Sequence, residues 1–301
     1  MHTLKDWIMA ARPWSFPASA MPVIVSATYL FWLGKEPDWL MVLWTLVTII
    51  IFHAAGNTWS DYNDYMKGVD RDDTIGGVSI TSGEFEPSEI KKFALLLLSA
   101  AVVSGLLITY SCGLPVLYFG LAGFVLTLMY PWLKYRALGD VDIFLTYSLL
   151  PLLGTSFVAI GEIEWSVCWL ALPVGLITVG ILHVNNMRDT LHDKRANIKT
   201  LAMMAGDRAS AIIYSFEVLF PFVCVAVCAV TGIFPIISLF VFAALKVAWK
   251  NALMAMRFQQ EGMDAVRGID EKSAQLQLMF SLLLSLSFVI SAFIRWYGFD
   301  F

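Results

Sequence analysis

The chain alternates between long apolar stretches and short polar connections. Stretches of about twenty apolar residues predict transmembrane helices, because a helix of that length crosses the hydrocarbon core of a bilayer. Nine such stretches are present, at roughly 14–33, 39–59, 91–111, 114–133, 141–160, 165–187, 209–231, 233–253 and 273–296. A short stretch before the first, Leu4–Ala11, is typical of an amphipathic helix at the membrane surface. We therefore expect an all-α polytopic membrane protein with nine transmembrane helices.

The composition supports this fold class. Of the 301 residues, 58% are hydrophobic and only 15% are charged, which would require an implausibly large core in a soluble protein. The four cysteines lie in or beside apolar stretches. Two of them share a helix face, but no further His or Cys is near them in sequence, so we interpret all four as packing residues. They are Cys112, Cys168, Cys224 and Cys228.

The basic residues predict the orientation of the chain. If all nine stretches cross the membrane, the N-terminus and the connections after even-numbered stretches share one side. Of the 20 Lys and Arg residues, only Lys35 and Arg295 fall on the opposite side. Because basic loops remain in the cytoplasm, we expect a multi-pass protein of the cell (inner) membrane whose N-terminus and polar loops face the cytoplasm.

A first acidic cluster follows the second apolar stretch. Asn57, Asp61 and Asp64 are spaced at i, i+4 and i+7, so they share one face if the helix continues, and Asp70 follows in the loop. Amide and carboxylate oxygens grouped in this way suit Mg²⁺, which proteins usually bind through one or two carboxylates together with substrate phosphates. The alternative interpretation of this cluster is a solvated loop.

A second cluster ends the sixth apolar stretch, where Asn185 and Asn186 precede Arg188, Asp189 and Asp193. Two oxygen-rich helix ends at the same membrane depth can hold metal ions between them. Handling a diphosphate requires such an arrangement, since its charge must be neutralised before it leaves. A solvated connector is again the alternative.

Several other polar residues have two interpretations. His53 lies one turn before Asn57, and is either a packed core histidine or a group that handles protons or binds an acceptor. Arg12 either anchors the chain at the membrane surface or holds an anion. Lys134 and Lys199 are either positive-inside anchors and loop cations or contacts to a diphosphate.

The two clusters resemble the paired motifs of the UbiA superfamily of intramembrane prenyltransferases. The closest likeness is to the branch that uses 1,4-dihydroxy-2-naphthoate in menaquinone biosynthesis. The residues that carry it are Asn57-x3-Asp61-x2-Asp64-x5-Asp70 with Lys67-Gly68 inside, Asn185-Asn186-x-Arg188-Asp189-x3-Asp193, Lys199-Thr200-Leu201-Ala202, Tyr130-Pro131, Leu138-Gly139-Asp140 and Arg12-Pro13-Trp14-Ser15-Phe16. Asn197 departs from a position where the branch often has glycine. The segment Gly76–Gly83 lacks the Arg-Pro-Leu run typical of the 4-hydroxybenzoate branch.

The resemblance implies one integral-membrane prenyltransferase domain over residues 1–301, with its helices around a central cavity and cytoplasmic loops capping it. It implies that Asp61, Asp64, Asp189 and Asp193 are the catalytic carboxylates and, with Asn57, hold Mg²⁺ against a polyprenyl diphosphate. The expected substrate-binding residues are Asn57, Lys67, Asp70, Lys134, Arg188, Lys199, Tyr130 and His53. The partners are then a polyprenyl diphosphate, an aromatic acceptor and the lipid bilayer, with no nucleic acid.

Three alternatives remain open at this point. One is prenyl transfer to another aromatic acceptor, of the 4-hydroxybenzoate or homogentisate type. Another is a membrane transporter, although its charged residues should lie near the membrane midplane rather than at one edge. The third is a lipid-binding scaffold without catalytic activity, which would not need two clusters suited to metal.

Overall fold

The computed structural model describes residues 2–71 and 78–298, and these residues contain helices and no β-strand. Asp72, Asp73, Gly76 and Gly77 of the first polar loop lie outside the described residues. The long helices are α2 (Pro17–Trp32), α3 (Trp39–Met66), α5 (Pro87–Cys112), α6 (Pro115–Lys134), α8 (Leu150–Ile160), α9 (Cys168–Arg188), α12 (Asp207–Val230), α13 (Leu245–Ala255) and α16 (Ile269–Trp296).

Shorter elements join them. They are α1 (Leu4–Ala10), η1 (Pro13–Ser15), α4 (Val78–Thr81), α7 (Gly139–Phe144), η2 (Leu145–Leu149), η3 (Trp165–Val167), α10 (Thr190–Arg195), α11 (Leu201–Ala205), η4 (Ile236–Ala244), α14 (Phe258–Glu261) and α15 (Met263–Val266). The π-helical turn η2 links α7 to α8 without a break, and η4 leads in the same way into α13. The helical stretch Leu4–Ala11 predicted from the sequence corresponds to α1.

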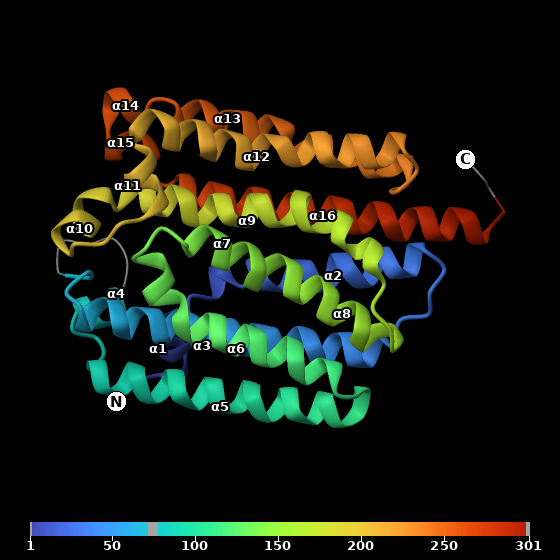
Figure 1. Ribbon diagram of the computed structural model, residues 1–301, viewed down its shortest axis with the longest axis horizontal. Coiled ribbons are helices and arrows are strands. Elements are labelled where there is room, and N and C mark those ends of the chain that lie inside the picture. The colour runs from blue at the N-terminus through green and yellow to red at the C-terminus, as the bar shows by residue number, and fades with distance from the viewer. Residues whose placement is uncertain (1, 72–77, 299–301) are drawn as a thin grey trace.

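Eight helical segments of the described residues are long and apolar enough to cross a membrane, against nine expected from the sequence. The remaining predicted crossing is α2, which has only 16 residues. Pro17 begins this helix, and the residues from Pro13 to Ser15 form a separate 3₁₀ turn before it. At 1.5 Å per residue α2 is about 24 Å long, shorter than a full hydrocarbon core. Figure 1 shows the N-terminus and the end of α16 at opposite ends of the bundle, as an odd number of passes requires. The expectation of an all-helical multi-pass membrane protein is confirmed.

The helices lie side by side, with α9 and α16 in the middle of the bundle (Figure 1). On one side they pack against α12 and η4, and on the other α16 packs against α2. Large side chains such as Tyr29, Phe280 and Phe288 are fully buried between these helices. The other part of the bundle is built from α3, α5, α6 and α8.

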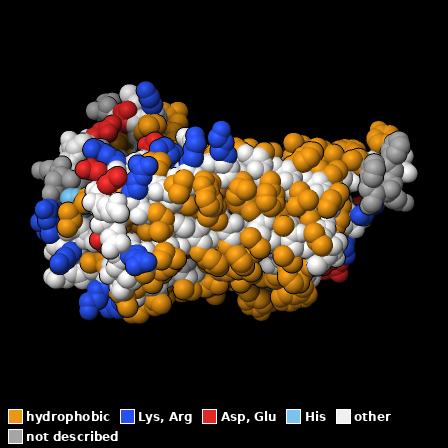
Figure 2. Space-filling view, turned by 90° about the horizontal axis from the view of Figure 1, so that it is seen from above, with side chains coloured by type: hydrophobic (Ala, Val, Ile, Leu, Met, Phe, Trp, Pro, Cys, Tyr) orange, Lys and Arg blue, Asp and Glu red, His pale blue; other side chains and the backbone are white. Residues whose placement is uncertain are grey.

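The surface divides into an apolar flank and a charged end. Figure 2 shows hydrophobic side chains over the length of the visible flank, while Lys, Arg, Asp and Glu gather mainly at one end. An apolar flank of this size is stable against lipid rather than water. The charged end is the one at which α3 and α9 finish and where α10, α11 and α14 lie (Figure 1).

The packing of α9 on the π-helical turn η2 generates a testable prediction. A Cβ at Gly175 would lie 2.7 Å from the Ser148 hydroxyl oxygen and 2.8 Å from the Phe144 ring, so Gly175→Ala forces the two elements apart. We expect a destabilisation of roughly 1–3 kcal/mol, typical of overpacking, visible as a lower thermal midpoint of the purified protein. Gly120→Ala is the matched control, because nothing lies within 4 Å of its Cβ position. Equal midpoints for the two variants would contradict this account of the contact.

Candidate active site

The end of α3 presents its polar residues on one face. The helix continues to Met66, as the spacing of Asn57, Asp61 and Asp64 requires, and both carboxylates are buried. Asp61 accepts a hydrogen bond from the Arg12 guanidinium, which lies 49 positions earlier in the chain. The Arg12 backbone is left-handed, with a φ of 57°, at the turn between α1 and η1. Arg12 therefore reaches an anionic group in the fold, which favours the second of its two interpretations.

Asp64 has two partners at the end of α6, its last residue Lys134 and the next residue Tyr135. Its carboxylate accepts a hydrogen bond from the Tyr135 hydroxyl at 2.6 Å and from the Lys134 ammonium at 3.2 Å. The Asp64 backbone carbonyl also accepts hydrogen bonds from the N–H groups of Val69 and Asp70. This turn brings Asp70 beside the other two carboxylates. Burial and, after it, the charges of Asp64 and Asp61 together raise the pKa of Asp70 to about 7.

The second cluster forms where α9 ends. The Arg188 guanidinium donates to both oxygens of Asp189, at 2.8 and 2.9 Å, and to the Asp270 carboxylate in the first turn of α16. Asp193 on α10 is 1% exposed. One Asp193 carboxylate oxygen and the Asn185 side-chain oxygen are buried without a hydrogen-bond partner. These two oxygens are therefore available to a cation or donor.

The two clusters are close enough to act on each other. The pKa of Asp193 is raised to about 6. Burial is the main cause, Lys134 acts against it, and the charges of Asp189 and Asp64 act with it. The connection after α6 lies between the clusters, since Lys134 and Tyr135 contact Asp64 while the Tyr135 carbonyl accepts the Lys199 N–H at 3.3 Å. The two polar motifs, far apart in sequence, thus form one anionic region at the charged end.

The remaining predicted residues lie around this region. The Lys67 ammonium lies 4.3 Å from the centre of the Tyr135 ring, and the Lys67 and Lys199 side chains are exposed. Tyr130 on α6 is partly buried. Among the described residues, no hydrogen bond joins Lys67, Lys199 or Tyr130 to a carboxylate of either cluster. Their roles in substrate binding stay predictions.

A hydrogen-bonded chain of side chains leads from the acidic region toward the apolar interior. The Asn57 amide donates to the Ser15 hydroxyl at 2.9 Å, and the two ring nitrogens of His53 lie 3.3 Å from the Ser15 hydroxyl and 2.9 Å from the Ser19 hydroxyl. The His53 ring also meets the Tyr147 ring edge to face, with centroids 4.7 Å apart. His53 is therefore a packed, hydrogen-bonded residue, and it also borders a cavity.

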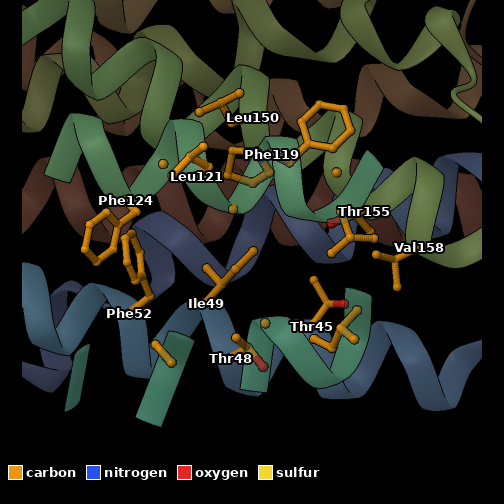
Figure 3. Close-up of a pocket in the computed structure, with 18 of the residues that line it drawn as sticks. Thr45, Thr48, Ile49, Phe52, Phe119, Leu121, Phe124, Leu150, Thr155 and Val158 are labelled. Atoms are coloured by element: carbon orange, nitrogen blue, oxygen red, sulfur yellow. The ribbon is translucent and has the colours of Figure 1, made fainter. Parts of the chain in front are cut away.

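This cavity has a volume of about 360 Å³ and lies between α3, α5, α6 and the segment from η2 to α8. Its wall is predominantly apolar and aromatic, as Figure 3 shows for Phe52, Phe119 and Phe124. Ser19, His53 and Tyr147 provide polar groups in the same wall. The charged end thus continues into a space suited to a long hydrocarbon group.

Some site residues were not found by sequence reasoning. Tyr135 has no sequence signal of its own, because a tyrosine near a membrane surface usually marks the interface. Asp270 starts a helix 82 positions after Arg188, and no spacing rule connects the two. Only the fold reveals these partners.

Two solved structures share this fold. One is described as digeranylgeranylglyceryl phosphate synthase, with a TM-score of 0.61 and 18% identity over 96% of this chain and all of the other. The other is described as a UbiA homologue from Archaeoglobus fulgidus bound to GPP and Mg²⁺, with a TM-score of 0.61 and 14% identity over 93% of this chain and 99% of that one. At these identities the likeness concerns the fold alone.

Comparison of the sequence identifies the family. UbiA prenyltransferase domain-containing protein 1 of Danio rerio is 32% identical over 224 residues, which span 72% of this chain and 66% of that relative. Its name gives no acceptor, so the 1,4-dihydroxy-2-naphthoate branch stays a prediction. Residues 19–267 match the UbiA prenyltransferase family, and the chain belongs to that family.

Proposed function

We propose that this protein transfers a polyprenyl group from a polyprenyl diphosphate to an aromatic acceptor, with Mg²⁺ and with 1,4-dihydroxy-2-naphthoate as the favoured acceptor. The observation that supports it best is the pairing of one buried anionic region with one adjoining apolar cavity. A prenyl diphosphate has the complementary form, with a polyanionic head and a hydrocarbon tail.

The donor set of the two clusters fits Mg²⁺. This ion prefers hard oxygen ligands, which here would come from the carboxylates of Asp61, Asp64, Asp189 and Asp193 and from the side-chain oxygen of Asn57. The Asp193 oxygen that is buried without a hydrogen-bond partner suits a metal ligand. Bound there, Mg²⁺ neutralises the diphosphate and makes it a better leaving group. The Archaeoglobus fulgidus relative, described with GPP and Mg²⁺, supports the same assignment.

The cations of the site support the next step. Arg12 pairs with Asp61, and Lys134 pairs with Asp64. Both side chains lie where they would donate charge-assisted hydrogen bonds to diphosphate oxygens, and such bonds would stabilise the leaving charge. Lys67 and Lys199 can reach the same anion from the loops. Arg188, held between Asp189 and Asp270, acts in this scheme mainly by positioning Asp189.

The cavity then receives the prenyl chain and its allylic cation. Apolar walls exclude water, which would otherwise capture the cation, and the rings of Phe52 and Tyr147 can stabilise it through cation–π contacts. His53 lies between the acidic region and the cavity, where it can hydrogen-bond an acceptor hydroxyl. The electron-rich acceptor ring attacks the cation, and with 1,4-dihydroxy-2-naphthoate the attacked carbon loses its carboxylate as carbon dioxide.

The choice of acceptor rests on the two motifs and on the absence of an Arg-Pro-Leu run in Gly76–Gly83. Acceptors of the 4-hydroxybenzoate or homogentisate type are the second candidates. A transporter is disfavoured because the charged clusters lie at one end of the bundle (Figure 2). We further propose that residues 1–301 act as one domain in the cell membrane with the clusters facing the cytoplasm, which the distribution of Lys and Arg supports.

A transfer assay tests this function. We expect the purified protein, given Mg²⁺, a polyprenyl diphosphate and 1,4-dihydroxy-2-naphthoate, to release diphosphate and form a prenylated product. Asp61→Asn and Asp189→Asn should each abolish turnover while the protein elutes and melts as a folded chain, because each removes a ligand charge from one cluster. Asp264→Asn, at an exposed position on the short helix α15, is the control.

Two results would contradict the proposal. Failure to form product with any member of a panel of aromatic acceptors would exclude the activity, and full activity of both cluster variants would exclude the site. Product with 4-hydroxybenzoate or homogentisate but not with the naphthoate would overturn the acceptor alone.

The cavity generates a separate prediction about chain length. Gly105 lines it, with no atom within 4 Å of a Cβ position. Its neighbour Ser104 hydrogen-bonds Thr48 on α3. Thr48 is five residues before His53, so this part of the cavity lies about 8 Å farther from the acidic end than His53 does. Gly105→Phe should therefore lower kcat/KM for long prenyl diphosphates about tenfold or more, from a steric cost of roughly 1–3 kcal/mol. The shortest donor should be unaffected, as should all donors with Gly105→Ala. An equal loss for every donor length would contradict this use of the cavity.

A further inference from the structure

Three buried ionisable side chains form a cluster that the proposed reaction does not use. They are Asp140 on α7, His183 on α9 and Glu217 on α12, at 7%, 0% and 4% exposure. One possible ligand atom from each lies within 4.8 Å of the others. Figure 1 shows α9 between α7 and α12, so the cluster joins three helices. We propose that Asp140, His183 and Glu217 bind a divalent cation of the Zn²⁺ or Mn²⁺ class, in a site distinct from that for Mg²⁺.

The charges of the cluster are not balanced by protein groups. His183 is the only ion-pair partner of Asp140 and of Glu217 within the described part of the chain, at 2.9 and 3.8 Å from one imidazole nitrogen, Nδ1. Asp140 Oδ1 and Glu217 Oε2 are buried without a hydrogen-bond partner. Two buried carboxylates in this state carry a large desolvation cost, which a bound divalent cation removes.

The other face of the imidazole is arranged as in a metal-bound histidine. His183 Nε2 lies 2.9 Å from the Ser210 hydroxyl oxygen at the start of α12. A proton on Nε2, donated to Ser210, would leave the Nδ1 lone pair to bind a cation beside the two carboxylates. Metal-binding histidines are oriented in this way by a partner on the second nitrogen. The Nδ1 to Asp140 distance of 2.9 Å also suits two ligands of one ion, each bound at about 2.0–2.2 Å.

Glu217 lies against α9 at Gly180. A Cβ at Gly180 would lie 3.5 Å from the Glu217 Cβ and 3.6 Å from the Glu217 Oε2 atom, at ordinary van der Waals distance. The Glu217 carboxyl is therefore beside α9, one turn from His183. The fold brings this carboxyl into the cluster rather than toward lipid.

The donor set selects the ion. Imidazole suits Zn²⁺ and other transition metals, while Mg²⁺ prefers oxygen ligands alone. The proposed site also lies apart from the proposed Mg²⁺ site, because His183 precedes Asp189 by six residues, or about 9 Å along the helix. An ion here links α7, α9 and α12 beneath the second acidic cluster, and so fixes the helix end that carries Asp189.

Co²⁺ binding tests the proposal, because Co²⁺ replaces Zn²⁺ and absorbs visible light in nitrogen and oxygen sites. The full chain, purified and stripped with a chelator, is titrated with Co²⁺ in excess Mg²⁺. We expect the wild type to bind one Co²⁺ per chain and to show a visible absorption band. Glu217→Gln and Asp140→Asn should lose the band, and Ser210→Ala should bind Co²⁺ with about tenfold lower affinity. Glu261→Gln, an exposed acid, and Asp193→Asn, in the acidic region, should both retain the band.

Thermal melting separates lost binding from lost folding. Without metal, Glu217→Gln should melt no lower than the wild type, since it removes an unpaired buried charge. Zn²⁺ should raise the midpoint of the wild type and leave that of Glu217→Gln unchanged. The proposal is overturned if the wild type binds no Co²⁺ in excess Mg²⁺, if Glu217→Gln retains the band, or if Asp193→Asn loses it.

Discussion

The arrangement at the charged end depends on keeping buried carboxylates next to compensating charge. Asp61 pairs with Arg12, Asp64 with Lys134, and Asp189 with Arg188, which also holds Asp270. The contacts of Asp61 with Arg12, of Asp64 with Lys134 and of Asp270 with Arg188 each join segments that are far apart in the chain. An unpaired carboxylate at such a depth would be costly, so the pairs constrain how α3, the connection after α6 and α9 meet.

The same constraint links structure to the proposed chemistry. The cations that balance the carboxylates before substrate arrives have the charge that a departing diphosphate needs. In the proposed function the carboxylates would hold Mg²⁺ and the same cations would bind the diphosphate, so acidic and basic residues would both be needed within this small region.

Much of the fold and of the acidic region could be predicted from sequence, because the signals are local. Apolar length predicted the crossings, and the spacing of Asn57, Asp61 and Asp64 predicted one helix face, which α3 bears out. The short α2 was predicted as a full crossing, since hydropathy does not register the prolines that delay its start.

The rest of the site depends on contacts between distant segments. Arg12 has two interpretations from sequence, because anchors and anion ligands have the same local pattern. Its pairing with Asp61 depends on the turn before η1. The cluster of Asp140, His183 and Glu217 was not predicted at all. Its members lie on three helices without a common spacing, and His183 is 43 positions from Asp140.

The central claim is that Asp61 and Asp64 share bound metal and diphosphate with Asp189 and Asp193. A crystal structure of the protein with Mn²⁺ and an unreactive prenyl diphosphate analogue measures this directly, because anomalous scattering locates Mn²⁺. The account predicts Mn²⁺ between the two pairs of carboxylates, in contact with the diphosphate, and the prenyl chain in the cavity beside His53. Diphosphate bound without metal, or held at the opposite end of the bundle near Lys35, would contradict it.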